Sequence, residues 1–306
     1  MRAQEKTVGD PAIDIQHETP ENPRTPVVWT VAGSDPGGGA GIQSDLKVLN
    51  AFGIHGCTVI TALTAQNTRE VTATESVSET LFRAQLDALA GDLPPAAIKT
   101  GMLGSAATCR VLAAFLATPD LAACPLICDP VLQSSSGAAL LDPEALDLLK
   151  HDIFPRVSVL TPNLPEAAHL LGDRNRSMEE TAEQMLALGV RSVLIKGGHA
   201  QGDDCRDYWT DGSIAMWLSS PRIDTRATHG TGCILSAAIA AGLALGKHIP
   251  EAIIDAKSFL NQCLRSPAHL GLGHGPMRIY PYLNDPKDKP LIADPGRKPR
   301  PPSSPA

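Results

Sequence analysis

The chain has 306 residues, 43% of them hydrophobic, which is enough to bury the core of one large α/β domain or of two smaller ones. Its formal net charge of −7 argues against a nucleic-acid-binding surface, which would need a basic patch. No run approaches the roughly 20 apolar residues of a membrane span, and the N-terminus lacks the apolar core of a secretory signal. We therefore expect a cytoplasmic protein with no nucleic-acid partner and no membrane contact.

The seven cysteines form no paired framework. Cys124 and Cys128 make a lone CxxxC with no second pair, so we interpret them as buried apolar thiols rather than as zinc ligands. Reduced thiols are typical of the cytoplasm.

Both ends of the chain are predicted to be mobile tails. Residues 1–26 are polar and show no hydrophobic period, and residues 284–306 are basic and rich in proline. Neither segment can bury enough apolar surface to offset the entropy lost on ordering. The folded domain is therefore expected over residues 27–283.

Between the tails, apolar runs alternate with helical patterns. The run at 27–33 predicts a strand, and 41–53 predicts a helix that ends on Gly53, a suitable C-cap. Further strands are expected at 57–67, 96–103, 125–132, 157–163 and 191–199, with a hairpin over 204–220 that turns at Asp211-Gly212. Further helices are expected at 78–93, 105–117, 143–151, 164–172, 177–189, 231–245 and 250–265. This alternation is typical of a mainly parallel sheet with helices on both faces, which binds ligands at the carboxyl ends of its strands.

The stretch GSDPGGGAG, residues 33–41, raises the question of a phosphate loop. It lacks the lysine of a Walker loop, and Ile42 stands where a dinucleotide fingerprint needs its last glycine. Asp35 in the loop and Asp45 beyond it would repel a phosphate, but they suit a ligand that offers N–H or O–H donors. This loop therefore favours a small polar substrate, with a plain tight turn as the alternative.

A second glycine site, HGTGC at 229–233, opens a helix that Thr228 or Thr231 can cap. Backbone N–H groups at a helix start form a nest that holds an anion and stabilises a transferred phosphoryl group. Cys233 lies in the first turn, where a thiolate is favoured and can take a proton from a hydroxyl. The alternatives are a structural turn and a small apolar core residue.

Three strand ends carry further polar residues. Asn163 and Glu166, in TPNLPEA, suit a hydrated Mg²⁺ beside phosphates, and Asp129 is a second carboxylate. Lys196, in KGGH, can meet a nucleotide phosphate. The alternative for Glu166 is an acid that stabilises the start of its helix.

These stretches resemble the ribokinase superfamily and, more closely, the hydroxymethylpyrimidine/phosphomethylpyrimidine kinases of thiamine biosynthesis. The matching segments follow in family order across residues 28–278 and are VAGSDPGGGAGIQSDLK, GCTVITALTAQNT, IKTGMLG, TPNLPEA, IKGGH and THGTGC. The resemblance implies a ribokinase-like three-layer sandwich and an enzyme that uses ATP and Mg²⁺. Such an enzyme phosphorylates the hydroxymethyl group of an aminopyrimidine and then the resulting monophosphate. The sequence departs from the family at 133–137, where QSSSG replaces a common Lys-Ser-Gly.

The resemblance also implies roles for single residues. The positions that match aminopyrimidine contacts are Gly33, Asp45, Gln66, Met102 and Val131. The positions that match the anion hole and its base are Gly230, Thr231, Gly232 and Cys233, with the cysteine where most relatives have an aspartate. The positions at the ATP phosphates are Asn163, Lys196 and Thr228, and those at Mg²⁺ are Glu166 and Asp129. Relatives are commonly dimers, so a homodimer edge is expected near residues 71–78.

Two rival functions remain at this point. Pyridoxal or pyridoxine kinases share the fold and a hydroxymethyl ring, but typically have aspartate at the Cys233 position. A non-catalytic pyrimidine sensor would be expected to have lost the nest, the Mg²⁺ acid or the base, and the sequence retains all three.

Overall fold

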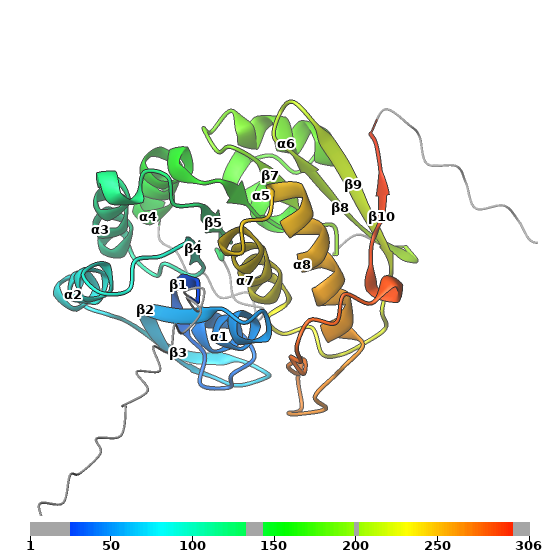
Figure 1. The fold of residues 1–306 in the computed structure, drawn as a ribbon, viewed down its shortest axis with the longest axis horizontal. Helices are drawn as coiled ribbons and strands as arrows, with labels where there is room; N and C mark the ends of the chain where they lie inside the picture. The colour runs from blue at the N-terminus through cyan, green and yellow to red at the C-terminus, as the bar shows by residue number, and fades with distance from the viewer. Residues whose placement is uncertain (1–24, 133–142, 199–201, 296–306) are drawn as a thin grey trace, which may run out of the picture.

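A computed structural model describes residues 25–132, 143–198 and 202–295. Within these residues one ten-stranded sheet has the order β10-β9-β8-β7-β6-β5-β4-β1-β2-β3 (Figure 1). Its strands are β1 Val27–Ser34, β2 His55–Gln66, β3 Val71–Ser76, β4 Ala97–Thr100, β5 Leu126–Cys128, β6 Val159–Leu160, β7 Val193–Ile195, β8 Asp204–Thr210, β9 Ala215–Pro221 and β10 Leu291–Ala293. The pairs from β2 through β1 and β4 to β7 are parallel, whereas β3, β8, β9 and β10 pair antiparallel. The predicted mainly parallel sheet is confirmed.

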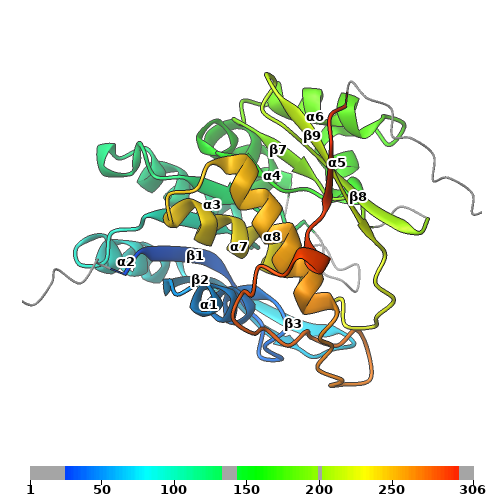
Figure 2. The ribbon, with the colours of Figure 1, turned by 45° about the vertical axis from the view of Figure 1, so that its right-hand side comes forward.

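Helices cover both faces of the sheet, as Figures 1 and 2 show. They are α1 Gly41–Ala51, α2 Glu79–Ala90, α3 Ala106–Leu116, α4 Pro143–Leu148, α5 Leu164–Leu171, α6 Met178–Leu186, α7 Thr231–Ala244 and α8 Ile249–Leu264. One apolar core lies beneath α2 to α6, and a second lies beneath α1, α7 and α8. The three-layer sandwich expected from the sequence is therefore confirmed.

Local signals explain where several elements begin and end. Ser78 caps α2 by accepting a hydrogen bond from the Leu81 N–H. The predicted hairpin between β8 and β9 turns at Asp211-Gly212, where Gly212 has a φ of 87° and the Asp211 carboxylate accepts from two following N–H groups. Helix α7 is buried along most of its length, so the nest at its start is fixed against the centre of the sheet.

The predicted boundary at residue 283 is wrong. Residues beyond it add β10, which pairs with the otherwise open edge of β9, after a short helical turn at Pro286–Asp288. Asp288 in that turn is buried and pairs with Arg265 of the body at 2.8 Å. An unpaired strand edge and a basic partner therefore order a segment whose composition alone indicates a tail. The rest of the expected tails, 1–24 and 296–306, lies outside the described residues, as does QSSSG.

Across the described ranges, no helix is long and apolar enough to span a bilayer. All seven cysteines lie in the described residues and none forms a disulfide. Of the CxxxC pair, Cys128 is buried in the core as expected, whereas Cys124 is only partly buried.

Candidate active site

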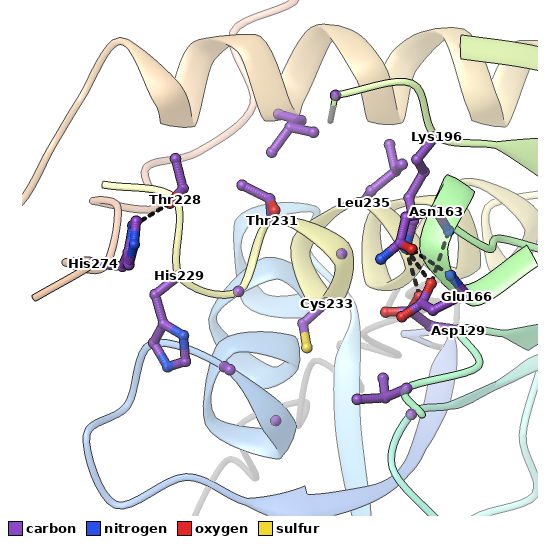
Figure 3. Close-up of a pocket in the computed structure, with 18 of the residues that line it drawn as sticks. Asp129, Asn163, Glu166, Lys196, Thr228, His229, Thr231, Cys233, Leu235 and His274 are labelled. Carbon is purple, nitrogen blue, oxygen red and sulfur yellow. Dashed lines mark hydrogen bonds and ion pairs between the residues drawn. The ribbon is translucent and has the colours of Figure 1, made fainter. Parts of the chain in front are cut away.

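A cavity of about 820 Å³ opens where the parallel strands end. Thirteen of the fourteen site residues predicted from the sequence line it, including both glycine loops and the polar ends of β5 and β7; the exception is Asp45. Figure 3 shows Thr228, His229 and His274 on one side, Asp129, Asn163, Glu166 and Lys196 on the other, and Cys233 between them. The expected convergence of loops into one site is confirmed.

The first glycine loop is organised by Asp35. Its carboxylate accepts hydrogen bonds from the N–H groups of Gly37, Gly39 and Ala40 at 2.8–3.1 Å. Burial alone would raise the pKa of Asp35, but hydrogen bonds from His229 and from these backbone groups outweigh it and hold the pKa below its usual value. The tight-turn alternative thus describes Asp35, while the loop as a whole still lines the cavity.

The two glycine loops touch backbone to backbone. A Cβ at Gly230, whose φ is 82°, would lie 1.9 Å from the carbonyl oxygen of Gly39. A Cβ at Gly39 would lie 2.4 Å from the His229 ring, and one at Gly41 would lie 2.3 Å from the carbonyl oxygen of Gly33. Close approach therefore requires all three glycines, and Gly41 and Gly230 also have a positive φ that disfavours other residues.

His229 joins the two loops, and the sequence analysis missed it. Its Nε2 lies 2.9 Å from Asp35 Oδ2 and 3.3 Å from Nε2 of Gln66. The ring is nearly buried and lines the cavity. Its place directly before the Gly-Thr-Gly was the available signal. Gln66 therefore has its amide at the wall of the cavity, where a pyrimidine contact is expected.

Asp45 does not line the cavity, so its expected direct contact with substrate is wrong for this structure. Its side chain on α1 turns into the sheet, where Oδ2 lies 2.8 Å from Lys99 Nζ and accepts from Thr30 Oγ1 at 2.5 Å. Lys99 on β4 does line the cavity. Burial alone would lower the pKa of Lys99, but the Asp45 carboxylate outweighs it and holds the pKa above its usual value. Asp45 thus acts on the cavity through Lys99, a buried cation on β4.

The nest at the start of α7 is open. Helix α7 has Gly230 as its N-cap residue and no side-chain cap, because Thr228 bonds His274 at 3.0 Å instead. The N–H groups of Gly232 and Cys233 have no acceptor within the described residues. Capping by Thr228 or Thr231 is therefore wrong, and the free N–H groups leave the helix start available to an anion.

Cys233 carries a neutral thiol rather than a thiolate. Burial raises the pKa of this thiol to about 11, and the nearby Lys99 ammonium offsets only part of the shift. The expected lowering of the pKa by the helix start is therefore wrong, because desolvation of the anion outweighs the dipole. The sulfur still faces the cavity beside the nest, as the view in Figure 3 shows.

Two carboxylates meet around Lys196 on the other side of the nest. Lys196 Nζ lies 2.8 Å from Asp129 Oδ1 and 3.8 Å from Glu166 Oε2. Glu166 also forms a capping box with Asn163, so its helix-start alternative is confirmed, while its role at Mg²⁺ stays a prediction. Burial raises the pKa of Glu166 to about 7; Lys196 opposes the shift and Asp129 adds to it. A Cβ at Gly232 would lie 2.9 Å from Asp129 Oδ2, so this cluster borders the nest.

A second buried ion pair, absent from the sequence predictions, lines the far part of the cavity. Lys257 Nζ on α8 lies 2.6 Å from Asp207 Oδ2 on β8, and the N–H of Gly197 donates to Asp207 Oδ1 at 2.9 Å. This pair ties the end of β7, which carries Lys196, to α8.

The sequence profile of the phosphomethylpyrimidine kinase family matches residues 35–278. A hydroxymethylpyrimidine/phosphomethylpyrimidine kinase of Rhizobium meliloti is 44% identical over 255 residues, covering 82% of this chain and 95% of its own length. Among solved structures, the phosphomethylpyrimidine kinase of Clostridium difficile is 37% identical with a TM-score of 0.68, covering 78% of this chain and 99% of that one. The pyridoxal kinase of Staphylococcus aureus, in complex with AMP-PCP and pyridoxal, is 29% identical with a TM-score of 0.77, covering 88% and 98%. Together with the open nest, the cysteine and the acidic cluster at the strand ends, these likenesses establish that the chain belongs to the phosphomethylpyrimidine kinase family.

Proposed function

We propose that this enzyme transfers a phosphoryl group from ATP to the hydroxymethyl group of 4-amino-5-hydroxymethyl-2-methylpyrimidine, and then phosphorylates the monophosphate to the diphosphate, in thiamine diphosphate biosynthesis. The observation that carries the proposal is the uncapped nest at Gly232 and Cys233, which lines the same cavity as Gln66 and a Lys196–carboxylate cluster. An acceptor alcohol on one side and nucleotide phosphates on the other would meet at the nest, where its N–H groups stabilise the charge of the moving phosphoryl group.

Individual residues would divide this work. Gln66 offers both a donor and an acceptor to the edge of an aminopyrimidine, with Gly33, Met102 and Val131 around the ring. Cys233 is the group positioned to take the proton of the hydroxymethyl group. Because its pKa is raised in the free protein, this role requires the bound complex to favour the thiolate.

Oxygen donors of Asp129 and Glu166 fit a hydrated Mg²⁺, since both carboxylates converge on one cation position that Lys196 now shares. The described part of the chain holds no cluster of three or more His, Cys, Asp or Glu side chains suited to a metal, which agrees with an ion carried mainly by nucleotide phosphates. Such an ion would neutralise phosphate charge.

Glu166→Gln, which keeps the shape and removes the charge, should lower activity and shift the Mg²⁺ titration to higher concentration. An unmoved titration would leave Glu166 only its capping role.

One coupled assay tests the main proposal. Release of ADP is measured with ATP and a panel that holds the hydroxymethylpyrimidine, its monophosphate and pyridoxine. We expect turnover of both pyrimidines and at most side activity on pyridoxine. Higher kcat/KM on pyridoxine would favour the rival vitamin kinase, and binding of the pyrimidine without turnover would favour the non-catalytic sensor.

We also infer a homodimer through the outer strand β3, whose side chains are almost all exposed beside the exposed Leu63 of β2. Sedimentation equilibrium of the full chain tests this inference, and a monomer at micromolar concentration would contradict it. The cytoplasmic location stays a prediction.

A further inference from the structure

Beyond the phosphate region, the cavity continues into an apolar slot. Leu235 lies one helical turn along α7 from the nest, and Leu260 and Leu264 of α8 line the same cavity together with Ile223, which follows β9. Apolar walls of this kind suit the faces of a flat nucleobase. This step rests on the proposed function, in which ATP is the phosphoryl donor.

Asn261 of α8 is an uncharged polar side chain that lines the cavity beside these leucines, one helical turn beyond Lys257. Asn261 is 3% exposed, and its Nδ2 donates to Ser220 Oγ at 2.9 Å and to the carbonyl oxygen of Asp288 at 2.8 Å. A carbonyl oxygen only accepts, so the NH₂ group must face Asp288, and the orientation of the amide is fixed. Its Oδ1 then has no donor within the described residues. This oxygen is not among the described side-chain atoms that are fully buried without a partner, so it is open to the cavity and can accept a hydrogen bond from a ligand that donates.

The carbonyl that fixes Asn261 comes from outside the family match. Residues 284–295 follow the matched range of 35–278, and Leu291–Ala293 within them pairs with the edge of the sheet as β10. Asp288 is 2% exposed, and its carboxylate holds Arg265, one helical turn beyond Asn261. The segment is therefore anchored on both sides of the hydrogen bond that it offers to Asn261.

We propose that Asn261 reads the exocyclic amino group of adenine through Oδ1, and that segment 284–295 holds Asn261 in that orientation. Adenine presents a 6-amino donor, whereas hypoxanthine and guanine present an oxygen there, which an acceptor repels. Asn261 is thus a specificity-determining residue, and Asp288 is a positioning residue that acts through its backbone.

The test compares ATP with inosine triphosphate, which exchanges the 6-amino group for an oxygen. In the full chain, KM and the equilibrium Kd should favour ATP about 10- to 100-fold, as expected for one buried hydrogen bond. Asn261→Leu should bring the ratio close to one, mainly by weakening ATP, and should leave the pyrimidine KM unchanged. Asp285→Asn is the matched control, since Asp285 caps the same turn without contacting Asn261; it should keep the full preference.

The role of the segment is tested by a chain ending at Leu283, which should lose the ATP preference as Asn261→Leu does. If that chain does not fold, Arg265→Gln in the full chain gives the same comparison and should reduce the preference. If Asn261→Leu keeps the wild-type preference for ATP over inosine triphosphate, Asn261 does not recognise adenine. If both segment variants keep that preference, segment 284–295 does not position Asn261. The nucleotide Kd is measured without the pyrimidine substrate. A protein that prefers ATP but does not phosphorylate the pyrimidine would therefore count against the proposed function alone.

Discussion

The reactivity of the Cys233 thiol depends on its environment. Because its pKa is raised to about 11, the neutral thiol dominates below that pH, and the thiolate fraction grows tenfold with each pH unit up to it. Inactivation of the free protein by iodoacetamide should therefore keep accelerating through pH 9–10, without a plateau near the ordinary value of about 8.5. Rates of inactivation across this range check the shift, and a plateau below pH 8.5 would contradict it. Bound pyrimidine should protect the thiol.

The same residue makes a kinetic prediction. Serine keeps the size of the side chain but cannot ionise near neutrality, so Cys233→Ser should lower kcat by about 10²–10⁴-fold and leave the KM for ATP similar. A variant within about threefold of wild type would assign catalysis to the nest alone.

Gln66 contacts the loops through His229, so its substitution needs two readouts. Gln66→Leu should raise the pyrimidine KM by an amount worth about 1–3 kcal/mol, because a polar edge of the substrate loses its partner. The ATP KM should not change. An unaltered pyrimidine KM would remove Gln66 from the substrate site.

Single-residue predictions from the sequence fail where they depend on the direction of a buried side chain. The motif containing Asp45 is plain in the sequence, but only the packing of α1 on β1 and β4 shows that its carboxylate meets Lys99 beneath the cavity. Likewise, the thiol of Cys233 lies at a helix start, and the extent of its burial comes from the loops around it.

At the scale of elements, the contact between the two glycine loops makes a sharp prediction. Gly39→Ala places a methyl group against the His229 ring, and either loop must shift. We expect a lower kcat/KM for the pyrimidine and a lower Tm. Gly91→Ala is the matched control, since its new Cβ meets nothing closer than 3.7 Å. Enzyme kinetics and thermal melting of both variants check this, and equal behaviour of the two would contradict the tight contact.

Most helices and strands were predictable because their apolar periods and caps are local. All of the predicted strands and helices are present, within a few residues of the expected bounds. Strand β10 was not predictable from the sequence, because Leu291–Ala293 is a short run between prolines. It becomes a strand only beside the edge of β9. A local sequence pattern does not show which strands will pair with one another.

At the scale of the molecule, two apolar cores share one sheet. Phe82 on α2 and Phe259 on α8 are both fully buried, one in each core. Phe82→Ala and Phe259→Ala should each lower the free energy of unfolding by about 3–5 kcal/mol. Leu81→Ala, at an exposed neighbouring position, should cost about 0.5 kcal/mol or less. Urea denaturation followed by circular dichroism measures these changes, and a small loss in either buried variant would show that its core relaxes around the cavity.

The bond between His229 and Asp35 joins residues 194 positions apart. The entropic cost of closing so long a loop rises only slowly with its length. The cavity, however, is not complete until the two glycine loops come together. A partly folded chain, with only one half of the sheet assembled, therefore offers nothing for a nucleotide or an acceptor to bind. Ligands recognise the finished fold alone and draw the folding equilibrium toward it by mass action. ATP or the pyrimidine, at concentrations above its Kd, should therefore slow the heat inactivation and proteolysis of this kinase.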